Sequence, residues 1–380
     1  MTLRVLHAPT AVGGQPQELV RAERALGLHS HAVSIEGPPF GYEIDEVLWH
    51  GDESLLVREA KRWRLLWRAL REFDVVHFNF GRSILPCATM PGCLPAYVGG
   101  GLVAAAAVAY ARLVCQADLP LLKRAGKAIF VTYQGDDARQ GDYCREHFAV
   151  HYVREVGAEY YPPASDAQKR QRIADFDRHA HGIYALNPDL LHVLPRRAEF
   201  LPYSSIDPRV WRSASVAGTR TRRTVAHAPT HRAVKGTRYL LEAVNRLKAE
   251  GLDVELSLIE NLPHRDVRAA LERADIFVDQ LLAGWYGGAA VEAMALGRPV
   301  VAYLREEDLA FVPEAIRRDL PVLSAQPATI YQVLKDLVSR PAADLAALGA
   351  RGRHYVERWH DPRVIAQRLK IDYERALARR

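Results

Sequence analysis

Residues 283–301, AGWYGGAAVEAMALGRPVV, constrain the fold more than any other stretch of the sequence. The expected helix inside it, residues 288–296, is apolar on nearly every side apart from Glu292. A helix with no polar face is buried. An expected strand at residues 276–280 precedes this helix, and another at residues 299–304 follows it. The stretch therefore predicts a buried helix between two strands of an α/β protein.

Glu292 is the one acid in this apolar helix. A carboxylate is almost never fully buried without a partner, because removing it from water is costly. The partner is either a protein donor, which would make Glu292 structural, or the hydroxyls of a ligand. Gly287 and Gly288 directly precede the helix, so a ligand can approach the backbone. The free N–H groups of a helix N-terminus attract anions, and nucleotide phosphates are obvious candidates.

The pattern G-x-x-G-G-x-x-x-E-A-M-A-L-G-R-P-V-V, which begins at Gly284, resembles the donor-binding stretch of glycosyltransferase family 4. Members of that family are retaining enzymes of GT-B architecture. The resemblance implies that Glu292 binds the ribose hydroxyls of a nucleotide sugar. The family usually carries a second glutamate eight positions earlier, which touches the donor sugar. Gly284 stands there instead, and Asp279 at the end of the preceding strand is a candidate substitute.

The chain length and charge limit the possible functions. A chain of 380 residues is too long for one ordinary core, so two domains are expected. The formal net charge of +6 suits an anionic ligand or a membrane surface. No nucleic-acid motif accompanies that charge, so no nucleic-acid partner is expected.

The cysteines and the apolar segments favour a cytoplasmic protein. Cys87, Cys93, Cys115 and Cys144 show no metal-site or disulfide spacing, so we expect reduced thiols. The N-terminus opens on a strand without a signal-peptide core. The most apolar window, residues 102–114, is too short to cross a bilayer and is expected to be a buried helix.

The N-terminus has the order of a doubly wound domain, with an expected strand at residues 2–8, then Gly13 and Gly14, then a helix. The loop lacks G-x-G-x-x-G, so a phosphate loop and a plain turn both remain open. The resemblance implies that Gly14 and its loop face the donor phosphates.

An amphipathic helix is expected over residues 53–73. One set of positions at helical spacing is apolar: Leu56, Ala60, Trp63, Trp67 and Leu70. A second set is basic: Lys61, Arg64, Arg68 and Arg71. We expect the apolar set to pack on the core and the basic set to be solvated. The alternative is a helix that makes peripheral contact with an anionic membrane.

Polar residues follow the expected strand at residues 128–133 and would line a ligand crevice. The family commonly shows H-G-x-D here; Asp137 matches the aspartate, and Gln134 replaces the histidine. An amide cannot act as a general base. The resemblance implies that the leaving phosphate accepts the proton, that Gln134 bonds a sugar and that Asp137 orients the acceptor. Alternatively, Asp136 and Asp137 cap the turn.

The second domain opens with an expected strand at residues 224–229 and a loop that holds Arg232 and Lys235. The next helix starts near Thr237. Two cations beside a helix N-terminus suit a diphosphate. The resemblance implies the same role, with Lys235 as the closer match; exposed basic residues without a role are the alternative.

Together these features predict an α/β GT-B protein with two Rossmann-like, doubly wound parallel-sheet domains that face a central cleft. We expect residues 1–211 to bind the acceptor and residues 212–360 to bind the donor, with residues 361–380 as a terminal helix that crosses back. The resemblance implies a glycosyltransferase that uses a UDP- or GDP-type sugar and a sugar or lipid-linked acceptor, without a metal or cofactor. A non-catalytic nucleotide-sugar-binding subunit and a nucleotide-sugar epimerase are the alternatives.

Overall fold

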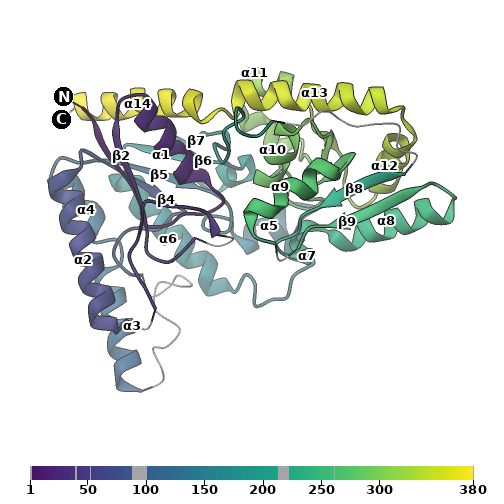
Figure 1. Cartoon of the computed structure of the whole chain (residues 1–380). Coiled ribbons are helices and arrows are strands. Elements are labelled where there is room, and N and C mark those ends of the chain that lie inside the picture. Colours follow the sequence, from purple (N-terminus) through teal and green to yellow (C-terminus); the bar gives the residue numbers. More distant parts are fainter. Residues whose placement is uncertain are drawn as a thin grey trace.

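The computed structural model describes residues 2–38, 41–51, 53–87, 101–212, 222–260 and 262–379. These residues form two parallel β-sheets, each flanked by helices (Figure 1). The predicted α/β class with two doubly wound units is therefore confirmed.

The first sheet has strand order β3-β2-β1-β4-β5-β6-β7 over the described residues, and every pair is parallel. Its strands are β1 (Arg4–Ala8), β2 (His29–Ser34), β3 (Glu46–Val47), β4 (Val75–Asn79), β5 (Ala128–Tyr133), β6 (Gly182–Ala185) and β7 (Glu199–Phe200). The chain reverses its direction of winding at β1 and β4, where ligand crevices of such sheets form.

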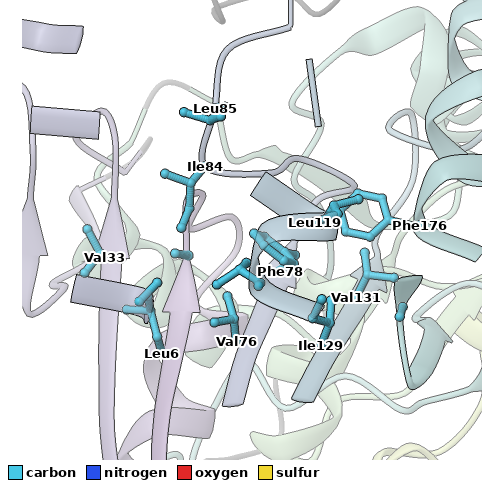
Figure 2. Packing of buried hydrophobic residues seen from close by; sticks show 14 of the residues in the cluster. Leu6, Val33, Val76, Phe78, Ile84, Leu85, Leu119, Ile129, Val131 and Phe176 are labelled. Carbon is cyan, nitrogen blue, oxygen red and sulfur yellow. The ribbon is translucent and has the colours of Figure 1, made fainter. Parts of the chain in front are cut away.

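Helices cover both faces of this sheet. They are α1 (Gln15–Ala25), α2 (Leu55–Glu72), α3 (Leu102–Val114), α4 (Asp118–Arg124), α5 (Gly141–His147) and α6 (Pro163–His179), with short 3₁₀ turns η2 (Tyr152–Arg154) and η3 (Pro188–His192). Figure 2 shows Leu119 of α4 and Phe176 of α6 over Phe78 and Val131 of the sheet. The strands are apolar on both faces because helices bury both.

The second sheet has the order β12-β11-β10-β8-β9 over the described residues. Its strands are β8 (Arg223–His227), β9 (Val254–Leu258), β10 (Ile276–Val278), β11 (Val300–Ala302) and β12 (Leu323–Ser324). Its helices are α7 (Arg232–Lys235), α8 (Thr237–Ala249), α9 (His264–Arg273), α10 (Gly288–Ala295), α11 (Glu314–Asp319), α12 (Ile330–Ser339) and α13 (Ala342–Trp359), with the 3₁₀ turn η4 (Glu307–Phe311). As predicted, α10 is buried: residues 290–295 are inaccessible or nearly so.

The final helix, α14 (Pro362–Ala378), returns to the first sheet, as predicted. Figure 1 shows α14 beside α1, with both chain termini at the same end of the molecule. Its Tyr373 hydroxyl accepts a hydrogen bond from His77 Nδ1 (2.6 Å) and donates to Glu23 Oε1 (3.2 Å). Burial lowers the pKa of His77 well below its usual value, so this histidine is a neutral core residue, as expected.

The predicted domain limits fall between the two sheets, since β7 ends at Phe200 and β8 starts at Arg223. The polar run predicted to link the domains, residues 212–223, lies mostly outside the described residues. The limits 1–211, 212–360 and 361–380 therefore stay predictions.

The predicted packing of residues 53–73 holds for Leu70, which packs against the core, and is wrong for the other four apolar positions, which are exposed. The side of α2 that faces the core consists of Arg62, Leu65, Leu66 and Ala69. The predicted core residues Leu56, Trp63 and Trp67 are instead 85%, 43% and 56% exposed. The exposed apolar set and the buried set of Leu65, Leu66 and Ala69 both recur at helical spacing in this segment. Periodicity could therefore not show which of the two sets faces the core.

Arg62 explains how an arginine takes the core side of α2. Its guanidinium donates to the Ile84 carbonyl (3.2 Å), pairs with Glu59 (3.2 Å) and lies 4.7 Å from the centre of the Trp49 ring. These contacts satisfy a buried charge that would otherwise be costly.

The predicted burial of residues 102–114 is also wrong. On α3, Leu102 and Leu113 are 90% and 83% exposed, and Ala111 is the buried position among those whose exposure is described. A helix rich in alanine and leucine has no internal signal for which neighbour covers it, so burial was inferred from composition alone.

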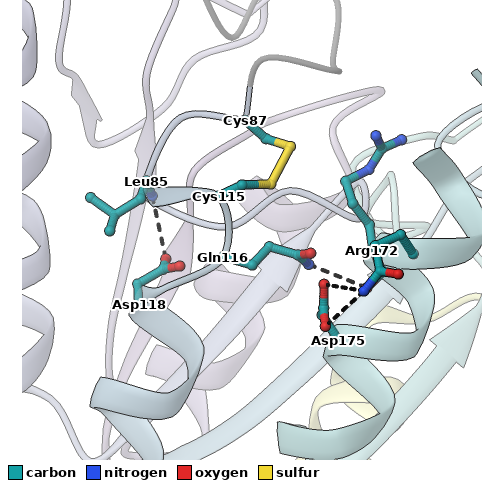
Figure 3. Close-up of a disulfide and its surroundings, with 8 residues drawn as sticks. Leu85, Cys87, Cys115, Gln116, Asp118, Arg172 and Asp175 are labelled. Atoms are coloured by element: carbon teal, nitrogen blue, oxygen red, sulfur yellow. Dashed lines mark hydrogen bonds between the residues drawn. A yellow bond between two sulfur atoms is a disulfide. The ribbon is translucent and has the colours of Figure 1, made fainter. Parts of the chain in front are cut away.

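The expectation of reduced thiols is wrong for two of the cysteines. Cys87 and Cys115 form a disulfide with their Cα atoms 4.5 Å apart (Figure 3). The two lie 28 residues apart in sequence, and only the tertiary fold brings them together. Cys144 is buried, and burial raises the pKa of its thiol to about 12. Cys93 lies outside the described residues.

His360 generates a pH prediction, because it fixes the junction between α13 and α14. Its Nδ1 donates to the Tyr203 carbonyl (2.8 Å), so its Nε2 accepts from the Tyr286 hydroxyl (2.9 Å). Burial lowers the pKa of His360 to about 4. In the unfolded chain the value is about 6.5, so the stabilisation is complete above that pH and is lost as the pH falls toward 4.

We therefore expect wild type to lose about 2 kcal/mol more unfolding free energy than His360→Gln between pH 7 and pH 4.5. Urea unfolding at a series of pH values measures this difference. The variant amide can donate to Tyr203 and accept from Tyr286, so it serves as the non-titrating control. Parallel pH profiles for the two proteins would contradict this role.

Candidate functional site

A cavity of about 300 Å³ lies between the two sheets, at the carboxyl ends of β1, β8 and β9. Residues of the first domain that line it are Val12, Gly13 and Tyr42. Residues of the second domain that line it are Ala228, Pro229, Thr230, Lys235, Ile259, Leu262, His264, Val267, Gly288, Ala289 and Glu292. Its wall is mostly apolar, with a lysine, a histidine and a glutamate placed in it, which is typical of a small-molecule site.

Glu292 projects from the buried helix α10 into this cavity and is 5% exposed. His264, at the start of α9, holds it: His264 Nε2 donates to Glu292 Oε1 at 2.7 Å. The Tyr42 ring stacks on His264 with the ring centres 4.2 Å apart. Burial, and then the nearby Glu292 charge, raise the pKa of the Tyr42 hydroxyl. One residue from the first domain therefore closes over the acid of the second.

Lys235 lies at the end of α7 and lines the same cavity. Its ammonium donates to Asp279 Oδ1 (2.8 Å) and Gln280 Oε1 (3.0 Å). Asp279 is 1% exposed, and its other oxygen accepts from the Gly287 N–H (2.6 Å). Asp279 thus fixes the lysine beside the N-terminus of α10. Its carboxylate is committed to these two groups and not to the cavity.

Gly14 and Ser205 bring the first domain close to the start of α10. Gly14 has φ +73°, and a Cβ there would lie 2.9 Å from the Ser205 carbonyl and 3.0 Å from the Tyr42 ring. Only glycine fits that conformation and space without strain. The Ser205 hydroxyl is buried without a protein partner, and it lies 3.7 Å from where a Cβ on Gly288 would stand. This unpartnered hydroxyl is therefore available to a ligand at the helix N-terminus.

Arg232 does not join this group. Its guanidinium pairs with Glu260 (2.6 and 2.8 Å), and its side chain is 58% exposed. It lines a separate surface hollow next to Glu155 and Arg238. The structure thus brings Gly13, Lys235, Gly288 and Glu292 together at one cavity and leaves Arg232 outside it.

The loop after β5 does not line this cavity either. Asp137 accepts hydrogen bonds from the backbone N–H groups of Gln134 (3.1 Å) and Gly135 (2.6 Å), so it caps the turn. Burial raises the pKa of Asp137 to about 6, although these two N–H donors oppose the rise. The side-chain nitrogen of Gln134 is buried without a protein partner.

Asp136 is the centre of a separate polar cluster. It accepts hydrogen bonds from the hydroxyls of Tyr152 (2.7 Å), Tyr160 (2.7 Å) and Tyr161, and it pairs with Arg139 (3.1 Å). Burial acts to raise its pKa, but the Arg139 charge and the tyrosine donors outweigh it and hold the pKa at about 2. Asp136 is therefore a permanently ionised carboxylate.

The structure explains why no glutamate stands at Gly284. This residue has φ +88°, and a Cβ there would lie 2.5 Å from Arg305 Nη1 and 2.8 Å from Asp308 Oδ2. Arg305 is held by Asp308 (2.7 Å) and by the Val150 carbonyl of the first domain (3.0 Å), and Asp308 also accepts from His192 (2.9 Å). A charge network between the domains occupies the space of the absent side chain.

Among the described residues, no group of three or more His, Cys, Asp or Glu side chains is arranged to hold a metal ion. Sequence reasoning missed Tyr42, His264 and Ser205. Tyr42 and Ser205 lie in connecting segments of the first domain and reach the site from across the cavity. His264 reaches Glu292 through the contact between two helices of the second domain, so no local pattern points to these three residues.

Comparison with known proteins agrees with this architecture. No protein-family model matches the chain. The chain is 30% identical over 226 residues to an MMP alpha-(1->4)-mannosyltransferase from Mycolicibacterium hassiacum, a match that covers 52% of this chain and 51% of that protein. The chain thus matches about half the length of this curated relative.

Among solved structures, the chain is similar to a sucrose-phosphate synthase (tll1590) from Thermosynechococcus elongatus, with a TM-score of 0.61, 15% identity and full coverage of both chains. A glycosyltransferase from Rickettsia africae ESF-5 gives a TM-score of 0.58 at 10% identity, with 99% of each chain covered. Anabaena Alr3699/HepE, solved in complex with UDP and glucose, gives 0.56 at 11% identity, with 97% of this chain and 98% of that chain covered.

At these identities the solved structures show the fold, which is GT-B. The predicted resemblance to glycosyltransferases of this architecture is confirmed.

The Gly284 geometry predicts the cost of restoring a side chain there. We expect Gly284→Ala to lower the free energy of unfolding by about 1–3 kcal/mol more than Gly297→Ala. Both glycines have positive φ, but a Cβ on Gly297 meets nothing within 4 Å, so the pair separates crowding from backbone strain. Thermal or urea unfolding measures the difference; equal losses would show that Arg305 moves aside without cost.

Proposed function

We propose that this protein is a glycosyltransferase that moves a sugar from a nucleotide-diphosphate sugar to an acceptor. The observation that carries the proposal is the convergence of Lys235 and Glu292 on one cavity between the two sheets. A cation and a carboxylate on one apolar wall match the two polar ends of a nucleoside diphosphate.

In this proposal the donor lies along the cavity with its diphosphate at Lys235 and the N-terminus of α10. Support comes from the fixed ammonium, the close backbone approach at Gly288 and the unpartnered Ser205 hydroxyl. The ribose hydroxyls bond to Glu292, whose protein partner is His264. The base packs on the apolar wall near Ile259 and Val267.

The proposed chemistry needs no strong base. Negative charge grows on the nucleoside diphosphate as the bond to the sugar breaks, and the Lys235 ammonium and the α10 N–H groups stabilise it. The leaving phosphate then takes the acceptor proton on the same face of the sugar, so the anomeric configuration is retained and no metal is required.

We assign the loop after β5 to the acceptor side. The unpartnered Gln134 amide would donate to a sugar hydroxyl. Asp136 and Asp137 are positioning residues in this account, because one binds three tyrosines and an arginine and the other caps the turn. The acceptor in this proposal is a sugar or a lipid-linked sugar.

A second candidate function is nucleotide-sugar binding without transfer, or epimerisation of the donor. The observation that favours it is the Arg305–Asp308 pair in the place of the missing glutamate. Product analysis separates these functions. A transferase consumes donor productively only with acceptor, an epimerase converts donor alone, and a binding subunit does neither.

Binding of the donor is tested by thermal shift with UDP, GDP and their sugars. At one hundred times its dissociation constant, a true donor stabilises the fold by about 2.7 kcal/mol. Lys235→Ala and Glu292→Gln should each weaken binding about tenfold to a hundredfold, because each removes a charge-assisted hydrogen bond worth about 1.5–3 kcal/mol.

Arg232→Ala is the matched control, since Arg232 comes from the same short helix α7 as Lys235 but pairs with Glu260 outside the cavity. We expect its donor affinity to stay within about threefold of wild type, less than the loss of one charge-assisted bond. If Lys235→Ala and Glu292→Gln bind like wild type, or if Arg232→Ala is the variant that fails, the proposed site is wrong.

A further inference from the structure

The helices α2 and α3 expose a large apolar surface, which we call the outer apolar face. It comprises Leu56, Trp63 and Trp67 of α2 with Leu102 and Leu113 of α3. These side chains are 85%, 43%, 56%, 90% and 83% exposed, respectively. Scattered exposed apolar residues are ordinary, but large apolar residues gathered on two neighbouring helices mark a candidate interaction surface.

The two helices are in direct contact with each other. Trp63 Nε1 donates to the Tyr110 hydroxyl of α3 (2.8 Å), and that hydroxyl donates to Glu59 of α2 (3.0 Å). On α2 the exposed positions Leu56, Trp63 and Trp67 recur at intervals of seven and four residues. On α3 Leu102 and Leu113 are eleven residues apart, close to three helical turns, so each set lies on one side of its helix. Figure 1 shows α2 and α3 extending from the first domain on the side away from the second sheet.

Three arginines lie beside the residues of the outer apolar face. Arg64 and Arg71 are exposed on the same side of α2 as the two tryptophans, and Arg112 is exposed beside Leu113. None of these three arginines forms an ion pair within the described parts of the chain. The nearby acids are already engaged, because Glu59 pairs with Arg62 and Glu72 with Arg68.

We propose that the outer apolar face docks on an anionic lipid bilayer. Tryptophans and leucines on one side of a helix enter the headgroup region, and arginines among them pair with anionic lipids. The indole is suited to this boundary because its ring is apolar and its N–H is polar. The structure thus favours the membrane interpretation of residues 53–73 and adds α3 to the surface.

The contact is a surface contact and not a crossing of the bilayer. Residues 104–124 are long and apolar enough to span a membrane by length and composition alone. However, Asp118 is fully buried and accepts from the backbone N–H groups of Ile84 (2.7 Å) and Leu85 (3.3 Å). The Cys87–Cys115 disulfide and the Gln116 bond to the Arg172 carbonyl lie next to it (Figure 3). The end of α3 is therefore fastened to the domain.

A second copy of the chain fits this face less well than a bilayer does. In a two-fold dimer the same patch meets itself, so the positive charges of Arg64, Arg71 and Arg112 on one copy would face the equally positive patch of the other. Like charges in such a contact repel, whereas anionic headgroups neutralise them. Charge complementarity thus selects the lipid surface.

The test is co-sedimentation of the intact protein with vesicles of phosphatidylcholine containing 30% phosphatidylglycerol, compared with phosphatidylcholine alone, an assumed composition of about one anionic lipid in three. We expect binding to the anionic vesicles that weakens as salt rises. Arg64→Gln/Arg71→Gln should reduce the partition coefficient about thirtyfold, which corresponds to about 1 kcal/mol for each charge. Trp63→Ser/Trp67→Ser should reduce it about tenfold or more.

Arg265→Gln/Arg351→Gln is the matched control, because it removes two exposed positive charges from the second domain. Its partition coefficient should stay within about threefold of wild type. Leu102→Ser/Leu113→Ser is a second apolar variant that keeps the hydrogen bond between the helices, and it should also lose binding. Circular dichroism checks that each variant folds, and nucleotide binding in solution should be unchanged in all of them.

Three results would overturn the inference. They are no binding of wild type to anionic vesicles, an equal loss in the Arg265/Arg351 control, and a wild-type dimer that the patch variants dissociate. Vesicle binding does not depend on sugar transfer, so its failure is distinguishable from failure of the proposed function.

Discussion

The buried carboxylate of Glu292 is the constraint on which the site depends. An acid in an apolar helix needs a donor, and the chain supplies His264 from the start of α9. That histidine stacks under Tyr42, which comes from the first domain. Because the buried charge of Glu292 needs a partner, α10, α9 and the first domain are brought into contact around the same cavity.

The cavity keeps its shape because the two domains are joined at several independent points. The crossover to α14 is fixed by His360, whose ring bonds Tyr203 and Tyr286, and the helix itself is fixed by Tyr373. Arg305 reaches the Val150 carbonyl of the first domain and adds a further contact between the domains. At Gly284, where the sequence resemblance led us to expect a glutamate, the chain therefore uses the space to hold the domains together.

Local sequence patterns predicted the parts of the protein that local physics determines. The α/β alternation and the burial of α10 follow from periodicity, glycine positions and strand order, whereas the expectation that Lys235 and Glu292 share one cleft came from the family resemblance. Features that depend on contacts between elements far apart in the sequence could not be predicted from local patterns. The core side of α2 was assigned to Trp63 and Trp67 because two apolar sets share one period, and the Cys87–Cys115 pair and the Tyr42–His264 stack exist only in the folded chain.

The most direct test of the central claim is a crystal structure of the protein with a bound nucleoside diphosphate. Our account predicts the diphosphate within hydrogen-bonding distance of Lys235 and the α10 N-terminus, and the ribose hydroxyls on the Glu292 carboxylate. A nucleotide bound elsewhere, with the His264–Glu292 pair intact and the cavity filled only by solvent, would contradict it.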